Sequence, residues 1–316
     1  VATDALQMHY QPLIRLADGS ISEFEALARL RDDSGELLSP ARFLPALGAD
    51  DLLALFGQGV RQALACREAL LQAGHPLDIS VNVPAAALED VRYAGVLAGL
   101  LSGSRCPPPS LLLEILESPI GTEHDVVLHG PGMQSLRALG IRLVEDDLGA
   151  GYSSLIRLRQ WPFDRIKIDQ AIVLQARQDP LGTLRFIRQL IRIGHDLQLE
   201  VVVEGLESAE LFEAAAILGA DFGQGYALAR PMPADALASW LVGHRHPPRR
   251  GGPRTGLGAL AGELRWEEQF VALPPEPAFW ARHAGGSCDP GEYLLGANLG
   301  AALNASHQAM HEAALA

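Results

Sequence analysis

The segment "IRLVEDD", residues 141–147, joins a run of Ile, Leu and Val to two adjacent acidic residues. Four other short apolar runs also end in polar residues: "LDISVN" at Asn82, "LLLE" at Glu114, "RIKID" with Lys167 and Asp169, and "LEVVVEG" with Glu204. Continuous apolar runs of this kind are typical of strands buried on both faces of a parallel sheet. We therefore predict that this segment is one of several similar strands, each buried on both faces and ending in polar residues.

Helical patterns lie between these strands. Leu184, Ile187, Leu190 and Ile191 recur at helical spacing within 183–198, and a second apolar stripe runs through 51–72. The alternation favours the α/β class, as a (β/α) barrel more than a doubly wound sheet, partly because no Gly-x-Gly-x-x-Gly turn follows a strand. In a barrel, the carboxyl ends of the strands meet at one mouth. The five polar strand ends are therefore expected to form one site.

Composition sets broad limits on the class of protein. The 316 residues suffice for one large barrel or for a barrel with an appendage, and 48% hydrophobic with 20% charged residues is typical of a globular protein. No apolar run approaches the roughly 18 residues of a membrane span, and no signal peptide opens the chain, so we expect a cytoplasmic location. The net charge of −13 argues against DNA binding. Cys66, Cys106 and Cys288 are too few for a disulfide framework.

The composition changes after Gly243. The segment "HRHPPRRGGPRTGLG", residues 244–258, is rich in Pro, Gly and Arg and predicts an exposed linker. We therefore divide the chain into a barrel at 1–243, a linker at 244–258 and a small helical extension at 259–316, which we expect to dock on the barrel or on another chain. Val1 stands where an initiator Met is expected, so we also expect upstream domains in a longer protein.

The strand ends carry a set of metal-binding side chains. Oxygen donors suit Mg²⁺ or Mn²⁺, and they are provided here by Glu25, within "FEALARL" at 24–30, and by Asn82, Glu114 and Asp146. The adjacent Asp146 and Asp147 allow one carboxylate to bridge two ions, an arrangement that activates water and stabilises an in-line phosphodiester displacement. Lys167 would add a cation or help to activate the water. Each residue alone has a simpler interpretation: Glu25 as a solvated charge, the Asp146–Asp147 pair as a turn or helix cap, and Lys167 as a surface residue. Their recurrence at successive strand ends favours one site.

Several motifs, in order, resemble the EAL-domain phosphodiesterases that hydrolyse cyclic di-GMP. The resemblance covers residues 8 to about 241 and rests on "YQPLI", "EALAR", "SVNV", "LEILES", "EDDLGAGYSSL", "FDRIKID", "VVVEGLES" and "GQGYALARPMP". It implies a (β/α)8 TIM-type barrel whose first strand is antiparallel to the others. It also implies a homodimer, with sensory or GGDEF-type domains upstream.

The resemblance also implies individual roles. It makes Glu25, Asn82, Glu114 and Asp146 ligands of one metal, with Asp146 bridging to a second metal that Asp147 completes. Lys167 matches the lysine that acts on the attacking water, and Glu204 an acid that anchors metal-bound water. The implied substrate-binding residues are Leu27, Arg29 and Gln224, and Glu117 matches the glutamate that holds the loop after Asp146. The chain departs from the family at Leu30, Leu148 and Ala150, which stand where Trp, Phe and Thr are common.

The C-terminal residues carry a weaker resemblance. Cys288, His307 and His311 are similar to three ligands of the chemoreceptor zinc-binding domain, and the two histidines are spaced to share one helix face. The fourth position falls at Glu263, with His283 as a substitute. The alternative is an exposed helix that carries two incidental histidines.

The acidic residues predict a phosphodiesterase that uses two divalent metals, Mg²⁺ or Mn²⁺, and the resemblance implies that it opens cyclic di-GMP to linear pGpG. Zn²⁺ binding in the tail is a separate hypothesis. The main alternative is a cyclic di-GMP receptor with little or no turnover, regulated through the tail; Ala150, which removes a hydroxyl from the aspartate loop, keeps it open. A third interpretation is a metal-dependent barrel that acts on another phosphodiester.

Overall fold

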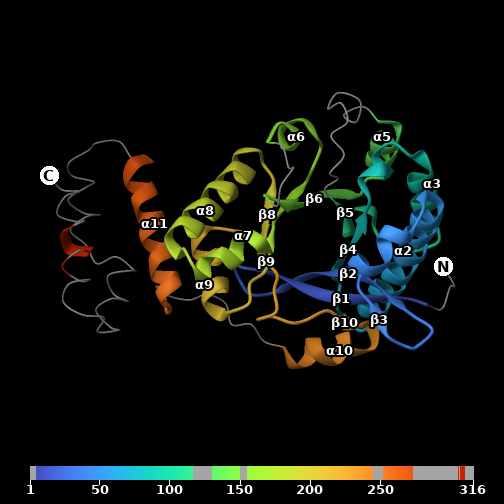
Figure 1. Ribbon diagram of the computed structural model, residues 1–316, viewed down its shortest axis with the longest axis horizontal. Helices are drawn as coiled ribbons and strands as arrows, with labels where there is room; N and C mark the ends of the chain where they lie inside the picture. Colours follow the sequence, from blue (N-terminus) through green and yellow to red (C-terminus); the bar gives the residue numbers. More distant parts are fainter. Residues whose placement is uncertain are drawn as a thin grey trace.

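Eight strands close into a barrel (Figure 1). The computed structural model describes residues 5–116, 130–149, 155–244 and 252–272, with 305 and 307–309. Around the barrel the strands follow the order β1 (Leu6–Arg15), β9 (Phe222–Gly223), β8 (Glu200–Val203), β7 (Arg165–Ile168), β6 (Arg142–Leu148), β5 (Leu111–Ile115), β4 (Asp78–Val83) and β2 (Ile21–Arg31).

The first strand runs against its neighbours. β1 is antiparallel to both β2 and β9, whereas every pairing from β2 through β4 to β9 is parallel. Two short strands extend the rim, because β3 (Leu37–Leu38) pairs with β2 and β10 (Met232–Pro233) pairs with β1. The predicted barrel class and its antiparallel first strand are confirmed.

Helices cover the outside of the barrel. They are α1 (Pro40–Phe43), α2 (Ala49–Gln72), α3 (Val91–Ser102), α5 (Pro131–Ala138), α6 (Leu155–Gln160), α7 (Gln170–Leu174), α8 (Pro180–Asp196), α9 (Ala209–Leu218) and α10 (Ala234–Gly243). The predicted helical stripes at 51–72 and 183–198 lie in α2 and α8. In α8 the Asp179 side chain caps the first turn by accepting from the Gly182 N–H, and the predicted apolar stripe is the buried face. The sequence pattern therefore determines which face of α8 packs on the sheet.

The barrel interior is built in layers, because alternate residues of a strand point to the same side. Leu13, Val202 and Phe222 form a small apolar cluster separate from the larger core between sheet and helices. At the amino-terminal ends of the parallel strands, the Arg165 guanidinium bonds to Glu23 at 2.5 Å and to Glu200 at 2.8 Å. Arg165 also lies 4.2 Å over the Phe222 ring. This ion-paired layer fills the end of the barrel opposite the mouth.

A further helix, α11 (Gly256–Ala272), packs against α9 and α8 (Figure 1). The residues just before it are tied to α9, because the Arg254 N–H and the Thr255 hydroxyl donate to the buried Glu213 carboxylate at 2.9 and 2.6 Å. Ala261 and Leu264 are buried against the barrel. The division into barrel, linker and tail stays a prediction. Among the helices of the described ranges, none combines the length and apolar composition needed to cross a bilayer.

Candidate active site

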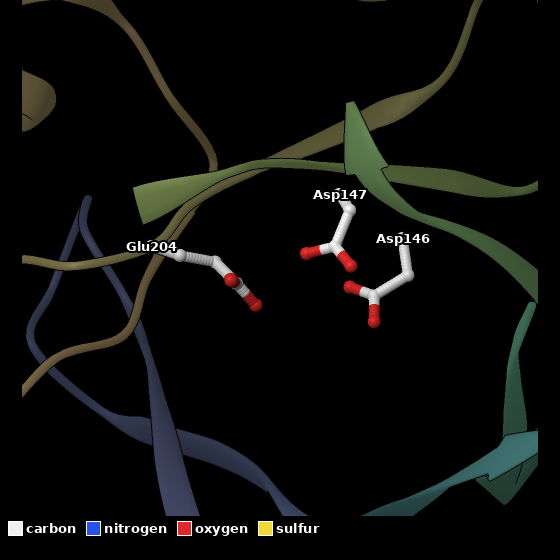
Figure 2. A group of neighbouring side chains, drawn as sticks. All are labelled: Asp146, Asp147 and Glu204. Carbon is white, nitrogen blue, oxygen red and sulfur yellow. The ribbon is translucent and has the colours of Figure 1, made fainter. Parts of the chain in front are cut away.

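Asp146 and Asp147 both reach the mouth because β6 is irregular. In a regular strand, consecutive side chains point to opposite faces. The β6–β7 register shifts between Glu145 and Leu148, and Asp147 has a left-handed φ of 57°. Carboxylate oxygens of Asp146, Asp147 and Glu204 consequently lie within 4.8 Å of one another. Figure 2 shows the three side chains pointing toward one another. This local distortion makes a three-acid cluster from the ends of β6 and β8, which lie on either side of β7.

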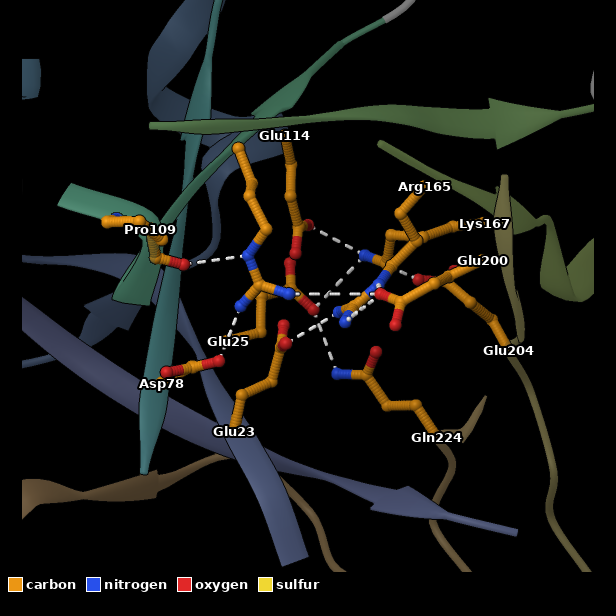
Figure 3. Close-up of polar contacts among 11 residues, drawn as sticks. Glu23, Glu25, Asp78, Pro109, Glu114, Arg165, Lys167, Glu200, Glu204 and Gln224 are labelled. Atoms are coloured by element: carbon orange, nitrogen blue, oxygen red, sulfur yellow. Dashed lines mark hydrogen bonds and ion pairs between the residues drawn. The ribbon is translucent and has the colours of Figure 1, made fainter. Parts of the chain in front are cut away.

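Lys167 lies at the centre of the acidic residues. Its Nζ is 2.6 Å from Glu204, 2.7 Å from Glu114, 3.1 Å from Asp146 and 3.4 Å from Glu25. Figure 3 shows Lys167 with Glu204, Glu114 and Glu25. Lys167 and its partners come from β7, β8, β5, β6 and β2, so the closure of the barrel assembles the cluster. Lys167 is also the only lysine in the sequence.

Amide side chains orient Glu25. The Asn82 Nδ2 donates to one Glu25 oxygen at 2.9 Å, and the Gln224 Nε2 donates to the other at 2.8 Å (Figure 3 shows the second bond). Glu25 and Gln224 are buried. The structure thus brings together residues from β2, β4 and the segment after β9 that are far apart in the sequence.

The pKa values of the acidic residues reflect burial of like charges. Burial and the neighbouring Asp146 raise the pKa of Asp147 to about 7, and burial raises the pKa of Glu204 to about 8 against the opposing effect of Lys167. Burial also raises the pKa of Glu114 and of Asp146. For Glu25, Lys167 and the two amide bonds outweigh burial and lower the pKa. The pKa of Lys167 lies well above its usual value because its four carboxylate neighbours outweigh burial.

The residues present fit divalent cations. When all are ionised, the one ammonium, of Lys167, leaves an excess of four negative charges on the five carboxylates, and two divalent ions would balance this excess. The five carboxylates belong to Glu25, Glu114, Asp146, Asp147 and Glu204. Gln224 Oε1 is buried and accepts no hydrogen bond within the described part of the chain. A buried acceptor without a donor is costly, and a bound ion or its water would satisfy it. The all-oxygen donor set matches Mg²⁺, Mn²⁺ or Ca²⁺ better than Zn²⁺.

A cavity of about 200 Å³ opens beside this cluster. Its walls include Glu25, Asp146, Lys167 and Glu204, together with the predicted substrate-binding residues Leu27, Arg29 and Gln224. Burial lowers the pKa of Arg29, although Tyr226 and Glu25 oppose the effect. The cavity gives a ligand access to the acidic cluster from the mouth of the barrel.

Comparisons with known proteins agree with this geometry. The EAL domain family model matches residues 1–231. The chain belongs to the EAL-domain family. It is 34% identical to the cyclic di-GMP phosphodiesterase RocR of Pseudomonas aeruginosa over 238 residues, which are 75% of this chain and 60% of RocR. Across the first three curated relatives, the matched share of the relative is 29%, 60% and 31%, so the chain spans less than two thirds of their length.

Solved EAL-domain structures share the fold. PaMucR phosphodiesterase in complex with c-di-GMP aligns with a TM-score of 0.67 and 29% identity, covering 74% of this chain and 94% of that one. Klebsiella pneumoniae BlrP1, in a complex with calcium and cyclic di-GMP, aligns with a TM-score of 0.60 and 27% identity over 73% of this chain and 56% of that one.

Two residues at the mouth of the barrel had no individual role predicted from the sequence, although Asp169 was named as a polar strand end. Tyr226 lines the cavity, is half-exposed, and stacks under the Arg230 guanidinium at 4.2 Å. Asp169, which caps α7, contacts Asp147 and contributes to its raised pKa. Both lie in motifs that the sequence had singled out, "GQGYALARPMP" and "FDRIKID", so their position in those motifs was the available signal.

Some predicted residues lie outside the described ranges. These are Glu117, Ala150, Cys288, His311 and the substitute His283. The other two predicted tail ligands are described and lie together, with His307 Nδ1 2.6 Å from Glu263 Oε1. Leu148 is buried at the end of β6, and its carbonyl accepts from the Asp169 N–H at 3.3 Å. The roles of all site residues stay predictions.

Proposed function

We propose that this EAL-domain chain is a metal-dependent phosphodiesterase that hydrolyses cyclic di-GMP to linear pGpG. The observation that carries the proposal is the cluster of four carboxylates around Lys167, of which Glu25, Asp146 and Glu204 line an open cavity and Asp146 and Glu204 lie close to Asp147. The names of RocR and of the PaMucR complex support the substrate. An acidic cluster of this kind would repel a phosphodiester unless cations neutralised it, which supports metal dependence.

Two bound divalent ions would activate a water molecule and stabilise the oxygen that leaves phosphorus. Glu25, Asn82, Glu114, Asp146, Asp147 and Glu204 would hold them or their water ligands. Lys167 would orient the attacking water by donating a hydrogen bond to it, since its ammonium already points at the centre of the cluster. Arg29, on the cavity wall, would bind a phosphate oxygen of the substrate.

The test is a turnover assay. The purified chain is incubated with cyclic di-GMP and either Mg²⁺ or Mn²⁺, and linear pGpG is followed by chromatography. Turnover that chelator abolishes supports the proposal. Binding of cyclic di-GMP without any product would instead support the receptor alternative, in which the same cavity binds the nucleotide but does not hydrolyse it. Turnover of other phosphodiesters at an equal rate would overturn the assigned substrate.

We propose a second function for the C-terminal part of the chain, which is zinc binding by Glu263, Cys288, His307 and His311. The specific observation is the approach of His307 to Glu263, which brings together two residues 44 positions apart that the sequence had paired as ligands. Elemental analysis of protein purified without chelator or metal-affinity tag should find one zinc per chain. Absence of zinc, or its retention in a Cys288→Ala and His311→Ala double variant, would overturn this assignment.

We also propose the assembly and setting that the family resemblance implies. The chain would act as a homodimer in the cytoplasm, joined to sensory or GGDEF-type domains of a longer protein. The low share of each curated relative that the chain spans supports the last point. Light scattering after size-exclusion chromatography should give twice the chain mass, and a monomer at micromolar concentration would contradict the dimer.

A further inference from the structure

A second cavity lies on the outer wall of the barrel, between α2 and α3. It has a volume of about 550 Å³, within the range of small-molecule sites. The two helices pack side by side (Figure 1). The cavity lies near the end of α2, which leads into the start of β4, and near residues 103–106, which lead into β5. It is thus at the amino-terminal ends of the strands, opposite the mouth that holds Lys167.

A buried arginine, Arg67, lines this cavity. Arg67 is only 5% exposed, and its Nε is buried with no hydrogen-bond acceptor in the part of the chain that the structure describes. No carboxylate of those residues forms an ion pair with its guanidinium. Burial of an unpaired guanidinium is costly, so such a group normally has an anionic partner. Among the described residues Arg67 has no such partner, and the cavity that it lines is where an anion could bind.

The charges around Arg67 favour an anion. Arg61 and Arg105 also line the cavity, and the one acidic residue of the lining, Glu68, lies 3.6 Å from Arg105. The cavity therefore carries an excess of positive charge on a chain whose net charge is −13. Arginine is suited to phosphate because its planar guanidinium can donate two parallel hydrogen bonds to phosphate oxygens.

The remaining wall is apolar and open. Leu64, Ala65 and Leu100 provide an apolar side, and Gly99 leaves free space, because a Cβ there would meet no atom within 4 Å. The cavity is much larger than a phosphate ion needs. We propose that the α2–α3 cavity binds a small phosphomonoester that bears an aromatic or other apolar group, with the phosphate on Arg67 and the apolar group against α3.

The proposal is tested with phenyl phosphate as the probe. Binding is followed on the full chain by NMR, in the presence of a chelator so that the metal cluster at the mouth does not contribute. The expected result is saturable shifts of the Gly99, Gly103 and Ser104 amides, with phenyl phosphate binding more tightly than inorganic phosphate and phenol binding weakest. Shifts confined to residues at the mouth, or no shifts at millimolar probe, would overturn the site.

Three variants separate the cavity from general electrostatic binding. Arg67→Met should raise the Kd for phenyl phosphate at least tenfold. Gly99→Leu, which fills the cavity without a change of charge, should do the same. Gly95→Leu is the matched control, because Gly95 is an exposed glycine one turn earlier on α3, also has open space at its Cβ, and does not line the cavity. Unchanged binding in both Arg67→Met and Gly99→Leu, or equal loss in Gly95→Leu, would refute the proposal.

Discussion

At the scale of single residues, the mouth depends on the choice of lysine at position 167. Lysine and arginine together number 25 in the sequence, and all of them except Lys167 are arginine. An ammonium is compact and carries three rotatable donors, so one Nζ can lie within 3.4 Å of four carboxylates from four strands. The planar, larger guanidinium of arginine could not occupy this central position without displacing the acids.

The single lysine gives a direct test of its charge. In protein labelled with ¹³C at the lysine side chain, Lys167 should give the one lysine Cε signal, and in chelator that signal should keep the shift of a protonated ammonium up to pH 10.5. The reason is that the surrounding carboxylates raise the pKa of Lys167 well above its ordinary value. A titration midpoint below pH 10 would contradict this arrangement of charges.

At the scale of the strands, β2 offers a matched pair of positions. Glu23 and Glu25 point into the barrel two residues apart; Glu23 bonds to Arg165 in the closed end, and Glu25 faces Lys167 at the mouth. Glu23→Gln should cost about 2 to 4 kcal/mol of unfolding free energy because it leaves Arg165 partly unpaired. Turnover measured well below the melting temperature should remain near the parent rate.

Glu25→Gln should behave in the opposite way. It removes one carboxylate from a cluster with excess negative charge, so stability in chelator should be kept or raised. Turnover of cyclic di-GMP should fall about 100-fold or more, since Glu25 is a predicted metal ligand. Chemical denaturation and the chromatographic assay, run on both variants, check the pair. Equal loss of turnover in Glu23→Gln and Glu25→Gln would show that the two layers are not functionally separate.

The turn after β8 holds Glu204 by close packing. Gly205 has a φ of +64°, and a Cβ there would lie 2.5 Å from the Gln170 Cβ. Gly205→Ala should therefore cost about 2 to 4 kcal/mol and lower turnover by moving Glu204. Gly219→Ala is the control, because Gly219 has a φ of +95° but open space, and it should cost only about 1 kcal/mol with turnover unchanged. Thermal melts of both variants measure the difference.

The strands and helices show which features the sequence could predict. The apolar runs ending at Asn82, Glu114 and Asp146 were sufficient to place β4, β5 and β6, because burial on both faces dictates their composition. The two-residue β9 carries too little pattern to be recognised. The hydrophobic periodicity of the sequence could not predict the irregularity at Asp147 either, because it depends on the register between β6 and β7. Family resemblance, not spacing, supplied the roles of Arg29 and Gln224.

At the scale of the whole molecule, the barrel carries unlike chemistry at its two ends. Paired charges, Arg165 with Glu23 and Glu200, close one end, whereas the mouth holds five acids against one lysine. An uncompensated cluster stores electrostatic free energy that bound cations would release. The fold can tolerate this because the eight-stranded closure and the helical layer around it provide the main core.

This imbalance predicts how stability depends on pH and metal. In chelator, burial holds the pKa of Asp147 at about 7 and that of Glu204 at about 8, while both groups have ordinary pKa values near 4 when unfolded. The folded chain therefore binds more protons than the unfolded chain between pH 4 and 8. Stability from these groups is present below about pH 4 and is lost progressively as pH rises from 4 to 8, so Tm should fall across this range. The lowered pKa of Glu25 has the opposite effect, because it makes stability rise with pH, and it does so only below about pH 4.5.

Saturating Mn²⁺ should flatten the fall in Tm with pH. Divalent ions bind the deprotonated carboxylates, so protons compete with metal, and the Tm increase caused by Mn²⁺ should grow from pH 5.5 to pH 8. Thermal melts in chelator and in Mn²⁺ at each pH give both curves. Glu204→Gln is the control, because loss of this group should flatten the fall in Tm between pH 7 and 8.5 in chelator. Parallel curves with and without Mn²⁺ would show that the mouth does not bind metal through these carboxylates.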